Sequence, residues 1–438
     1  METESPHDLK AFWQLMWPTE IVSLAIGLLM SIARPSAFIV AAPFLVLWAA
    51  SPLIAFRVSR RLPEKKETLS QDERRLVRLI SRRTWKFFET FVGADDNWLA
   101  PDNYQEDPKP MLAHRTSPTN IGLLLLSTAA ARDMGYVGLL ELIERLELTF
   151  ATMDKLDRFH GHFLNWYDTR TLTPLVPQYI STVDSGNLAG HLLALKQGCI
   201  EMVELPLFDE RVIAGLTDTI SLMQEEAGKI GPVRQSTGAV TIKQLRREIE
   251  SCAALMSKQS PDTLSGWFAL IQSVAKGAVE IEDIINALSQ EHAGGQFEQL
   301  SSWAHSLIHQ AREHRRDLDT LAPWASFAPT MAQTITACSD EIAAGWNRIM
   351  GSLDSVPSLN QLPSICEEAL EKFATLRLQI EQCSAAHREK ALRNLDLLMN
   401  YIEAACEAAL ALAARYWEIA HRSDDTMEAM DFRVLFDE

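Results

Sequence analysis

Two long apolar runs near the N-terminus dominate the pattern of hydrophobic and polar positions along this chain. The second run, residues 37–56, contains no charged side chain across 20 residues, about the length that a helix needs to cross ~30 Å of hydrocarbon. A helix in a protein core is rarely apolar on every face. The run therefore predicts a membrane-spanning helix, in which Pro43 and Pro52 produce kinks.

The first apolar run, residues 12–33, is followed by Arg34 and Pro35, a pair typical of a turn. The two runs together predict a helical hairpin in the membrane. An alternative is that residues 12–33 lie in the membrane interface, with Trp13 and Trp17 among the lipid headgroups.

Ten basic residues lie between positions 57 and 83, directly behind the second run. Because lysine and arginine are enriched on the cytoplasmic side of membrane proteins, the region after residue 57 is expected in the cytoplasm. The acidic start, METESPHD, lacks the basic region of a secretory signal. The formal net charge of −17 argues against a general nucleic-acid binder, which presents a basic surface to phosphates.

The pattern after the basic residues is helical. Ser70 and Glu73 have the spacing of a capping box and predict the start of a helix, and apolar residues at steps of three and four continue it to about Val92. A polar, proline-rich segment at residues 93–118 follows. Loops of this length are often functional.

Helices are expected at residues 119–134 and 138–157, separated by Gly135, and again at residues 184–204. The aromatic and β-branched segment at residues 161–180 predicts a short hairpin. Helical hairpins joined by long loops are typical of an α/α barrel.

Residues 207–422 change to long helices with alternating charged and apolar positions, which predict an amphipathic helical bundle inserted into the chain. Residues 427–438 (MEAMDFRVLFDE) return to a strand-like pattern without a closing element. The chain is therefore expected to be cut from a longer one.

Polar and aromatic side chains are concentrated in residues 102–109, 114–120, 165–169 and 184–191. If these loops meet at one mouth of a barrel, they form a cleft of carboxylates, amides and aromatic rings. Such a cleft suits a sugar, whose hydroxyls need polar partners and whose C–H faces stack on rings. No metal-ligand spacing, Gly-rich phosphate loop or nucleophile elbow occurs, so no metal or cofactor is expected in this segment.

Each residue also has a structural interpretation, which the sequence leaves open. These alternatives are a solvated or capping acid at Glu106 and Asp107, an N-cap at Asp184, a carboxylate partner for Arg115, buried hydrogen-bonded rings at His114 and His191, and core tryptophans at Trp98 and Trp166.

Four strings, taken in order behind a membrane hairpin, make the chain resemble the middle region of the cyclic β-1,2-glucan synthases. These strings are NWLAPDNYQEDPKPMLAHRTSPTNIGL, GHFLNWYDTRTL, STVDSGNLAGHL and MDFRVLFDE. The resemblance covers residues 69–204 and the membrane hairpin and returns at the last string, so about half of the chain carries it.

The resemblance implies a large protein of the bacterial inner membrane. Such a protein joins a glycosyltransferase module that uses UDP-glucose, several membrane helices, a glycoamylase-like α/α barrel and a phosphorylase-like module. The implied fold is mainly α. It consists of a membrane hairpin and basic segment at residues 1–66, the first part of the α/α barrel at 67–206, a helical insertion at 207–426 and a return to the barrel at 427–438.

The implied function is transglycosylation that closes a linear β-1,2-glucan into a ring, with the glucan, the lipid bilayer and the remaining modules as partners. This chemistry requires two carboxyl groups, which the resemblance puts beyond Glu438, so the chain alone is expected to be inactive. The remaining candidate glucan-binding residues are Asn103, Glu106, His114, Arg115, Asn120, Asn165, Trp166, Asp168, Asp184, Asn187 and His191. A competing hypothesis is a non-catalytic, membrane-anchored scaffold whose helical bundle binds a partner.

Overall fold

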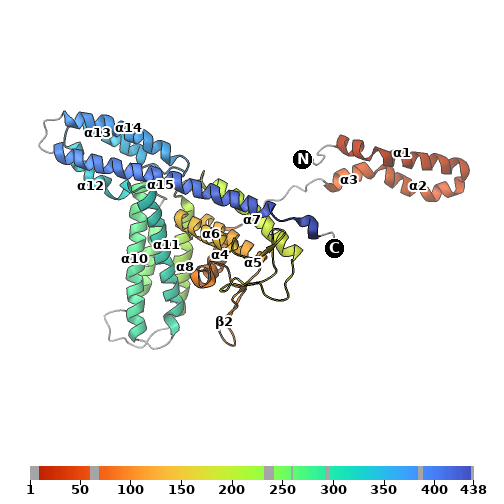
Figure 1. Ribbon diagram of the computed structural model, residues 1–438, viewed down its shortest axis with the longest axis horizontal. Helices are drawn as coiled ribbons and strands as arrows, with labels where there is room; N and C mark the ends of the chain where they lie inside the picture. The colour runs from red at the N-terminus through yellow and green to blue at the C-terminus, as the bar shows by residue number, and fades with distance from the viewer. Residues whose placement is uncertain are drawn as a thin grey trace. The chain divides into compact units, whose positions relative to one another are not determined.

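The computed structural model is mainly helical and divides into two compact units, Met1–Gln71 and Asp72–Glu438 (Figure 1). It describes residues 9–59, 69–230, 241–257, 260–291, 295–382 and 388–435.

The first unit is a helical hairpin, as predicted. Helix α1 (Leu9–Ala33) packs against α2 (Pro35–Ala49) and α3 (Ser51–Ser59). Pro35 occupies the first turn of α2, where its missing N–H breaks no helical hydrogen bond. By length and composition α1 could cross a membrane, and α2 and α3 together pass the same test as a bent pair.

The helix predicted at residues 37–56 is divided, because the chain bends by 44° between α2 and α3, next to Pro52, where a kink was predicted. The N–H of Ala50 still donates to the carbonyl oxygen of Val46 at 2.9 Å. Pro52, in the first turn of α3, has no N–H with which to continue this pattern, so the helix ends and restarts there. Pro43 lies inside α2 without ending it.

The hairpin leaves most of its apolar surface uncovered. Leu24, Ile32, Ile39 and Val58 are 70%, 74%, 76% and 80% exposed. Water-soluble proteins rarely present apolar surface of this extent, whereas lipid tails cover it at no cost. The first unit thus has the surface of a membrane-associated segment.

The second unit begins at α4, directly behind Ser70 as predicted. Its elements are α4 (Gln71–Phe91), η1 (Ala94–Asp96), β1 (Tyr104–Gln105), β2 (Met111–Leu112), β3 (Arg115–Thr116), α5 (Pro118–Asp133), α6 (Leu139–Met153), β4 (Arg158–Phe159), β5 (His162–Phe163), β6 (Tyr167–Asp168), α7 (Thr182–Met202), α8 (Glu210–Lys229), α9 (Ile242–Met256), α10 (Leu264–Glu291), η2 (Gly295–Phe297), α11 (Glu298–Leu321), α12 (Trp324–Thr336), α13 (Asp340–Leu353), α14 (Leu362–Glu381), α15 (Arg388–Glu428) and η3 (Phe432–Leu435).

Local sequence explains where the helices around the loops begin and end. The side chain of Ser117 accepts a hydrogen bond from the N–H of Asn120 and caps α5. Ser181 caps α7 in the same way by accepting from the N–H of Asp184. After α5 the chain turns at Gly135, whose φ of 78° is unfavourable for residues with a side chain.

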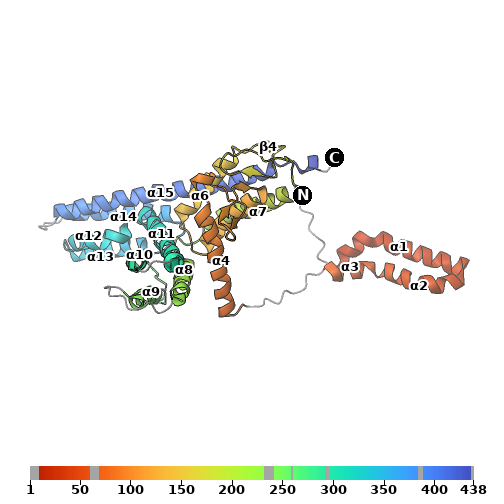
Figure 2. The ribbon, with the colours of Figure 1, turned by 90° about the horizontal axis from the view of Figure 1, so that it is seen from below.

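Helices from the predicted barrel and the predicted insertion share one hydrophobic core. Helix α5 packs against α6 and α7, α7 packs against α15, and α11 packs against both α8 and α6 (Figures 1 and 2). The hydroxyl of Tyr416 on α15 donates to the carbonyl oxygen of Leu139 on α6 at 2.9 Å. The boundary at residue 207 and the α/α barrel itself remain predictions.

Helix α15 is also long and apolar enough to cross a membrane. Unlike α1, it has one face inside a protein core, where Leu398, Ile402 and Tyr416 are completely buried. This face is thus covered by protein, whereas Leu397, Leu410 and Trp417 are 44%, 54% and 44% exposed.

One local prediction is wrong. Residues 427 and 428 of the expected strand-like segment continue α15, and residues 432–435 form the short helix η3; residues 436–438 lie outside the described residues.

The hairpin predicted within residues 161–180 is present around the Asp168–Arg170 turn. An antiparallel bridge joins Tyr167 to Pro174, and the N–H of Leu175 donates to the carbonyl oxygen of Trp166 at 2.9 Å. In addition, β5 pairs with β4 and β6 pairs with β3.

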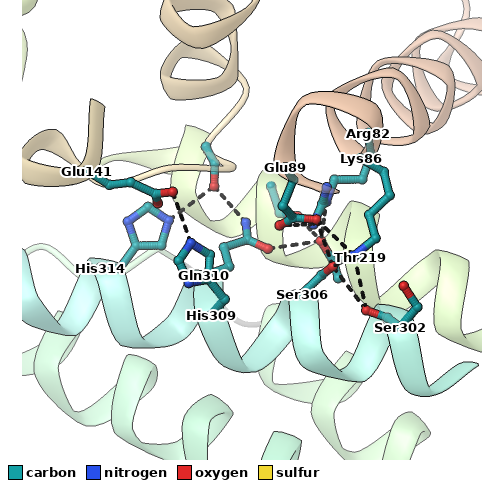
Figure 3. Close-up of polar contacts among 12 residues, drawn as sticks. Arg82, Lys86, Glu89, Glu141, Thr219, Ser302, Ser306, His309, Gln310 and His314 are labelled. Atoms are coloured by element: carbon teal, nitrogen blue, oxygen red, sulfur yellow. Dashed lines mark hydrogen bonds and ion pairs between the residues drawn. The ribbon is translucent and has the colours of Figure 1, made fainter. Parts of the chain in front are cut away.

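A buried polar network connects α4 with α8 and α11 (Figure 3). Arg82 of α4 is 0% exposed, and its Nε donates to Oγ1 of Thr219 at 2.8 Å. Its Nη2 lies 3.3 Å from Oε1 of Glu89, whose Oε2 accepts from the Ser306 hydroxyl at 2.9 Å. Burial raises the pKa of Glu89, but the charges of Arg82 and Lys86 outweigh it and lower this pKa to about 2. Glu89 is thus ionised at neutral pH and balances a buried guanidinium.

The network continues to the turn between α5 and α6. Thr219 Oγ1 donates to Oε1 of Gln310 at 2.9 Å, and Nε2 of Gln310 donates to the carbonyl oxygen of Gly135 at 2.7 Å. Burial lowers the pKa of His314 to about 4, so its ring is neutral, and Nε2 donates to the same oxygen at 3.1 Å. Helix α11 therefore fixes this turn through two hydrogen bonds.

The basic residues after position 57 do not form one membrane-facing group. Arg82 is buried in the network, and Arg78 pairs with Asp218 of α8 at 2.8 Å. Residues 60–68, which carry Arg60, Arg61, Lys65 and Lys66, lie outside the described residues. The predicted basic juxtamembrane segment, which ends at residue 66, therefore remains a prediction.

Candidate functional site

Two loop segments, residues 93–117 and 157–181, contain every described non-glycine residue with a left-handed backbone. These four residues, with φ of 50°, 59°, 47° and 61°, are Asn97, Trp98, His160 and Leu172. Such conformations cost about 1–3 kcal/mol each and persist only where surrounding contacts fix them, which is typical of functional sites. The strain therefore supports the prediction that these loops carry the function.

Strands β3 and β6 join the two loop segments. Their antiparallel register pairs Arg115 with Asp168. The N–H of Thr169 donates to the carbonyl oxygen of His114 at 3.1 Å, and Nδ2 of Asn97 donates to that of Thr169 at 2.8 Å. Backbone pairing thus brings together side chains that are distant in sequence.

Arg115 is the centre of one polar cluster. Its Nε and Nη2 lie 3.1 and 2.9 Å from Oδ2 of Asp102, and its guanidinium carbon lies 4.8 Å from the centroid of the Trp166 ring. Nδ2 of Asn120 donates to the other oxygen of Asp102 at 3.4 Å. Two predicted site residues, Arg115 and Asn120, thus contact one carboxylate, and a third, Trp166, stacks on Arg115. The alternative that Arg115 pairs with a carboxylate is confirmed, whereas its contact with a ligand remains a prediction.

A second polar cluster connects the first turns of α5 and α7, next to Asn120. The hydroxyl of Thr119 donates to Oδ1 of Asp184 at 2.5 Å and accepts from Nδ2 of Asn187 at 3.1 Å. Asp184 is not the N-cap of α7, because Ser181 has that role. The carboxylate of Asp184 therefore links α7 to α5. The two clusters are neighbours because Thr119 of the second directly precedes Asn120 of the first.

Three other predicted site residues lie on the strands or turns of the loops. Asn103 is exposed and donates from Nδ2 to Asp102 at 3.0 Å. Glu106 is exposed between β1 and β2. Asp168 accepts from the N–H groups of Arg170 and Thr171, both at 2.9 Å, and the hydrogen bond from Thr171 is the main reason that its pKa is lowered. Asp168 thus shapes its own turn.

Two further predicted residues, Asn165 and His191, have packing roles. Asn165 is 3% exposed, and its backbone N–H and side-chain oxygen both bond to the backbone of Tyr179. His191 of α7 lies against Gly122 of α5, where an added Cβ would be 2.2 Å from its Nδ1. Burial lowers the pKa of His191. Both residues fix the framework of the loops, and a contact with ligand remains a prediction for them.

His114 is held by an acid that was not predicted. Its Nδ1 lies 2.7 Å from Oδ1 of Asp96, which is 4% exposed and also accepts from the hydroxyl of Thr169. Asp102 and Thr119 were missed as well. All three lie within or beside the quoted strings, but a single sequence does not show which polar residue of a loop faces another loop.

The two clusters combine carboxylates, amides, a guanidinium and an indole that is partly exposed. This set can donate to and accept from hydroxyl groups and stack on an apolar face. Within the described ranges, no group of three or more His, Cys, Asp or Glu side chains is arranged to hold a metal ion. The two clusters thus offer hydrogen-bond donors, hydrogen-bond acceptors and one aromatic ring.

Comparison with known proteins agrees with the resemblance noted in the sequence. No protein-family model matches the chain. The chain is similar to the cyclic β-(1,2)-glucan synthase NdvB of Rhizobium meliloti (strain 1021), with 36% identity over 311 residues. The match takes 70% of this chain but 11% of that protein, so the chain spans about a tenth of its relative. This identity supports membership of the chain in the cyclic β-1,2-glucan synthase family, as a relative of one part of such a protein.

Proposed function

We propose that the loops at the first turns of α5 and α7 bind β-1,2-glucan and form part of the module that closes the glucan into a ring. The observation that carries the proposal is the stack of Arg115 on the partly exposed Trp166. Nε and Nη2 of Arg115 both contact Oδ2 of Asp102, and Asn120 holds the other oxygen of this carboxylate. Immobile aromatic and polar groups lose little entropy when a flexible sugar chain binds.

None of the acids in these loops is proposed as a catalytic group. Asp168 is occupied by its own turn, Asp184 by Thr119 and Asp102 by Arg115. Glycosyl transfer needs one carboxyl group that delivers a proton and a second that acts at the anomeric carbon, on opposite sides of one bond. We infer that the chain binds glucan without cleaving it, and that UDP-glucose is the donor of another module of the family.

The first unit is proposed to lie in the inner membrane of a bacterium, with the loops on the cytoplasmic side. The support is the exposed apolar surface of the hairpin and the basic residues that follow it in sequence. In this arrangement the hairpin anchors in the membrane the chain that carries the glucan-binding loops.

Replacing Trp166 by alanine is expected to weaken binding of linear β-1,2-glucan oligosaccharides at least tenfold. Loss of the ring removes a stacking face, and a tenfold change corresponds to about 1.4 kcal/mol. Isothermal titration calorimetry on the full chain in detergent measures the effect. Trp417→Ala is the matched control, because Trp417 is a 44% exposed tryptophan on α15, outside the loops. Equal losses in the two variants would argue against the assigned site.

A further inference from the structure

Asp96 and His114 form a dyad whose geometry goes beyond the general glucan-binding role. Asp96 is almost completely buried, and its Oδ1 accepts from both Nδ1 of His114 and the hydroxyl of Thr169. Because an ionised carboxylate only accepts hydrogen bonds, the proton between the two residues belongs to Nδ1 of His114. The neutral ring then carries its lone pair on Nε2.

The backbone on both sides of the dyad is fixed. Thr169 contacts Asp96 through its hydroxyl and donates its N–H to the carbonyl oxygen of His114, so one residue holds both members. Directly after Asp96, Asn97 and Trp98 adopt consecutive left-handed conformations. Their carbonyl oxygens accept hydrogen bonds from Thr152 and Thr149 of α6. The strained segment is thus anchored from a neighbouring helix.

The free edge of the ring is accessible. The His114 side chain is 32% exposed, whereas that of Asp96 is 5% exposed. Within the part of the chain that the structure describes, Nε2 has no hydrogen-bond partner. The next residue, Arg115, belongs to the cluster with Trp166 and Asp102. The dyad and this cluster are thus consecutive along the chain, and both lie beside β6 and the residue that follows it.

We propose that His114 accepts a hydrogen bond through Nε2 from a hydroxyl group of the bound glucan, with Asp96 as the positioning residue that fixes its tautomer. This inference rests on the proposed function. The clusters around Asp102 and Asp184 use their carboxylates internally, whereas Nε2 of His114 is an acceptor held in place and left for the ligand. It selects a ligand that presents a hydroxyl donor.

His114→Asn tests the proposal, because an asparagine amide can replace the Nδ1–H that donates to Asp96 but offers nothing at the position of Nε2. We expect unchanged folding, followed by circular dichroism, and at least tenfold weaker binding of β-1,2-glucan oligosaccharides to the full chain in detergent. Equal affinity of the two proteins would overturn the inference while leaving the proposed function intact. Failure of the unchanged chain to bind would overturn both.

The positioning role of Asp96 has its own spectroscopic test. In ¹⁵N spectra of histidine-labelled chain, with His114→Asn used to assign the signal, His114 is expected to carry its proton on Nδ1. In the Asp96→Asn variant, the side-chain amide of residue 96 is expected to donate a hydrogen bond to Nδ1 of His114. The ring proton of His114 is then expected on Nε2. A role confined to packing would leave the tautomer unchanged, and that result, or a ring protonated on both nitrogens in the unchanged chain, would contradict the assignment.

Discussion

Replacing Glu89 by alanine is expected to lower the free energy of unfolding of the second unit by about 3–5 kcal/mol, because it leaves a buried guanidinium without its counter-ion. Arg82 has no exposed surface, and its remaining polar partner is the neutral hydroxyl of Thr219. Tyr136 and Trp303 lie 5.2 Å from its guanidinium carbon and attract it too weakly to replace a charge. Urea unfolding of the chain, followed by circular dichroism, measures the loss.

The neighbouring pair provides a matched control for this experiment. Arg83 lies next to Arg82 on α4 and pairs with Glu225 of α8 at 2.5 Å, but both side chains are 43% exposed. Glu225→Ala is expected to cost less than about 1 kcal/mol, since water solvates the charge that remains. Similar losses for Glu89→Ala and Glu225→Ala would show that burial of Arg82 has no energetic consequence and would contradict the account of the network.

Gly135→Ala is expected to destabilise the second unit by about 2–6 kcal/mol, the sum of left-handed backbone strain and overpacking. The φ of Gly135 is 78°, and an added Cβ would lie 2.0 Å from the carbonyl oxygen of Arg211. The backbone cannot move away freely, because the carbonyl oxygen of Gly135 accepts from Gln310 and His314. The midpoint of thermal unfolding should therefore fall markedly.

Gly198→Ala is the control for Gly135→Ala. Gly198 lies inside α7, and an added Cβ would meet nothing within 4 Å. Because alanine favours helix by up to about 1 kcal/mol over glycine, this variant should be as stable as the unchanged chain or slightly more stable. A similar fall in both midpoints would mean that the tight turn between α5 and α6 does not constrain residue 135.

Signals that act over a few residues were readable in the sequence. Ser70 preceded a helix as predicted, Gly135 ended one, and Arg34 with Pro35 formed the turn of the hairpin. Each of these depends on the conformational preference or hydrogen bonding of one or two residues. Pro52 was recognised as a kink, but its bend was large enough to divide the predicted helix.

Contacts between distant segments were not readable. Arg82 belongs by sequence to a basic segment behind a membrane helix, but Thr219 and Glu89 hold it in the core. Arg115 meets Trp166 because β3 pairs with β6, and it meets Asp102 because the backbone of Asp102 pairs with that of Ala113, beyond the β1–β2 ladder. One sequence contains no record of such pairings. The resemblance of the loop strings could therefore predict the candidate residues without showing which acids hold them.

The relation to the family also extends further than the strings indicated. A match of 311 residues is longer than residues 1–206 and 427–438 together, so it includes part of the predicted insertion. The helices of that region share a core with α5, α6 and α7 and fix the Gly135 turn through α11. We infer that the helices of the predicted insertion support the loops structurally. This role favours the glucan-binding hypothesis over the competing hypothesis of a partner-binding scaffold.

The most direct test of the account is calorimetric titration of the full chain with linear β-1,2-glucan oligosaccharides and, for comparison, β-1,4-linked oligosaccharides of the same length. The account predicts saturable binding of the β-1,2-linked ligand, at least tenfold tighter than that of the β-1,4-linked one. Absence of binding, or equal binding of both ligands, would contradict the assignment of these loops to β-1,2-glucan.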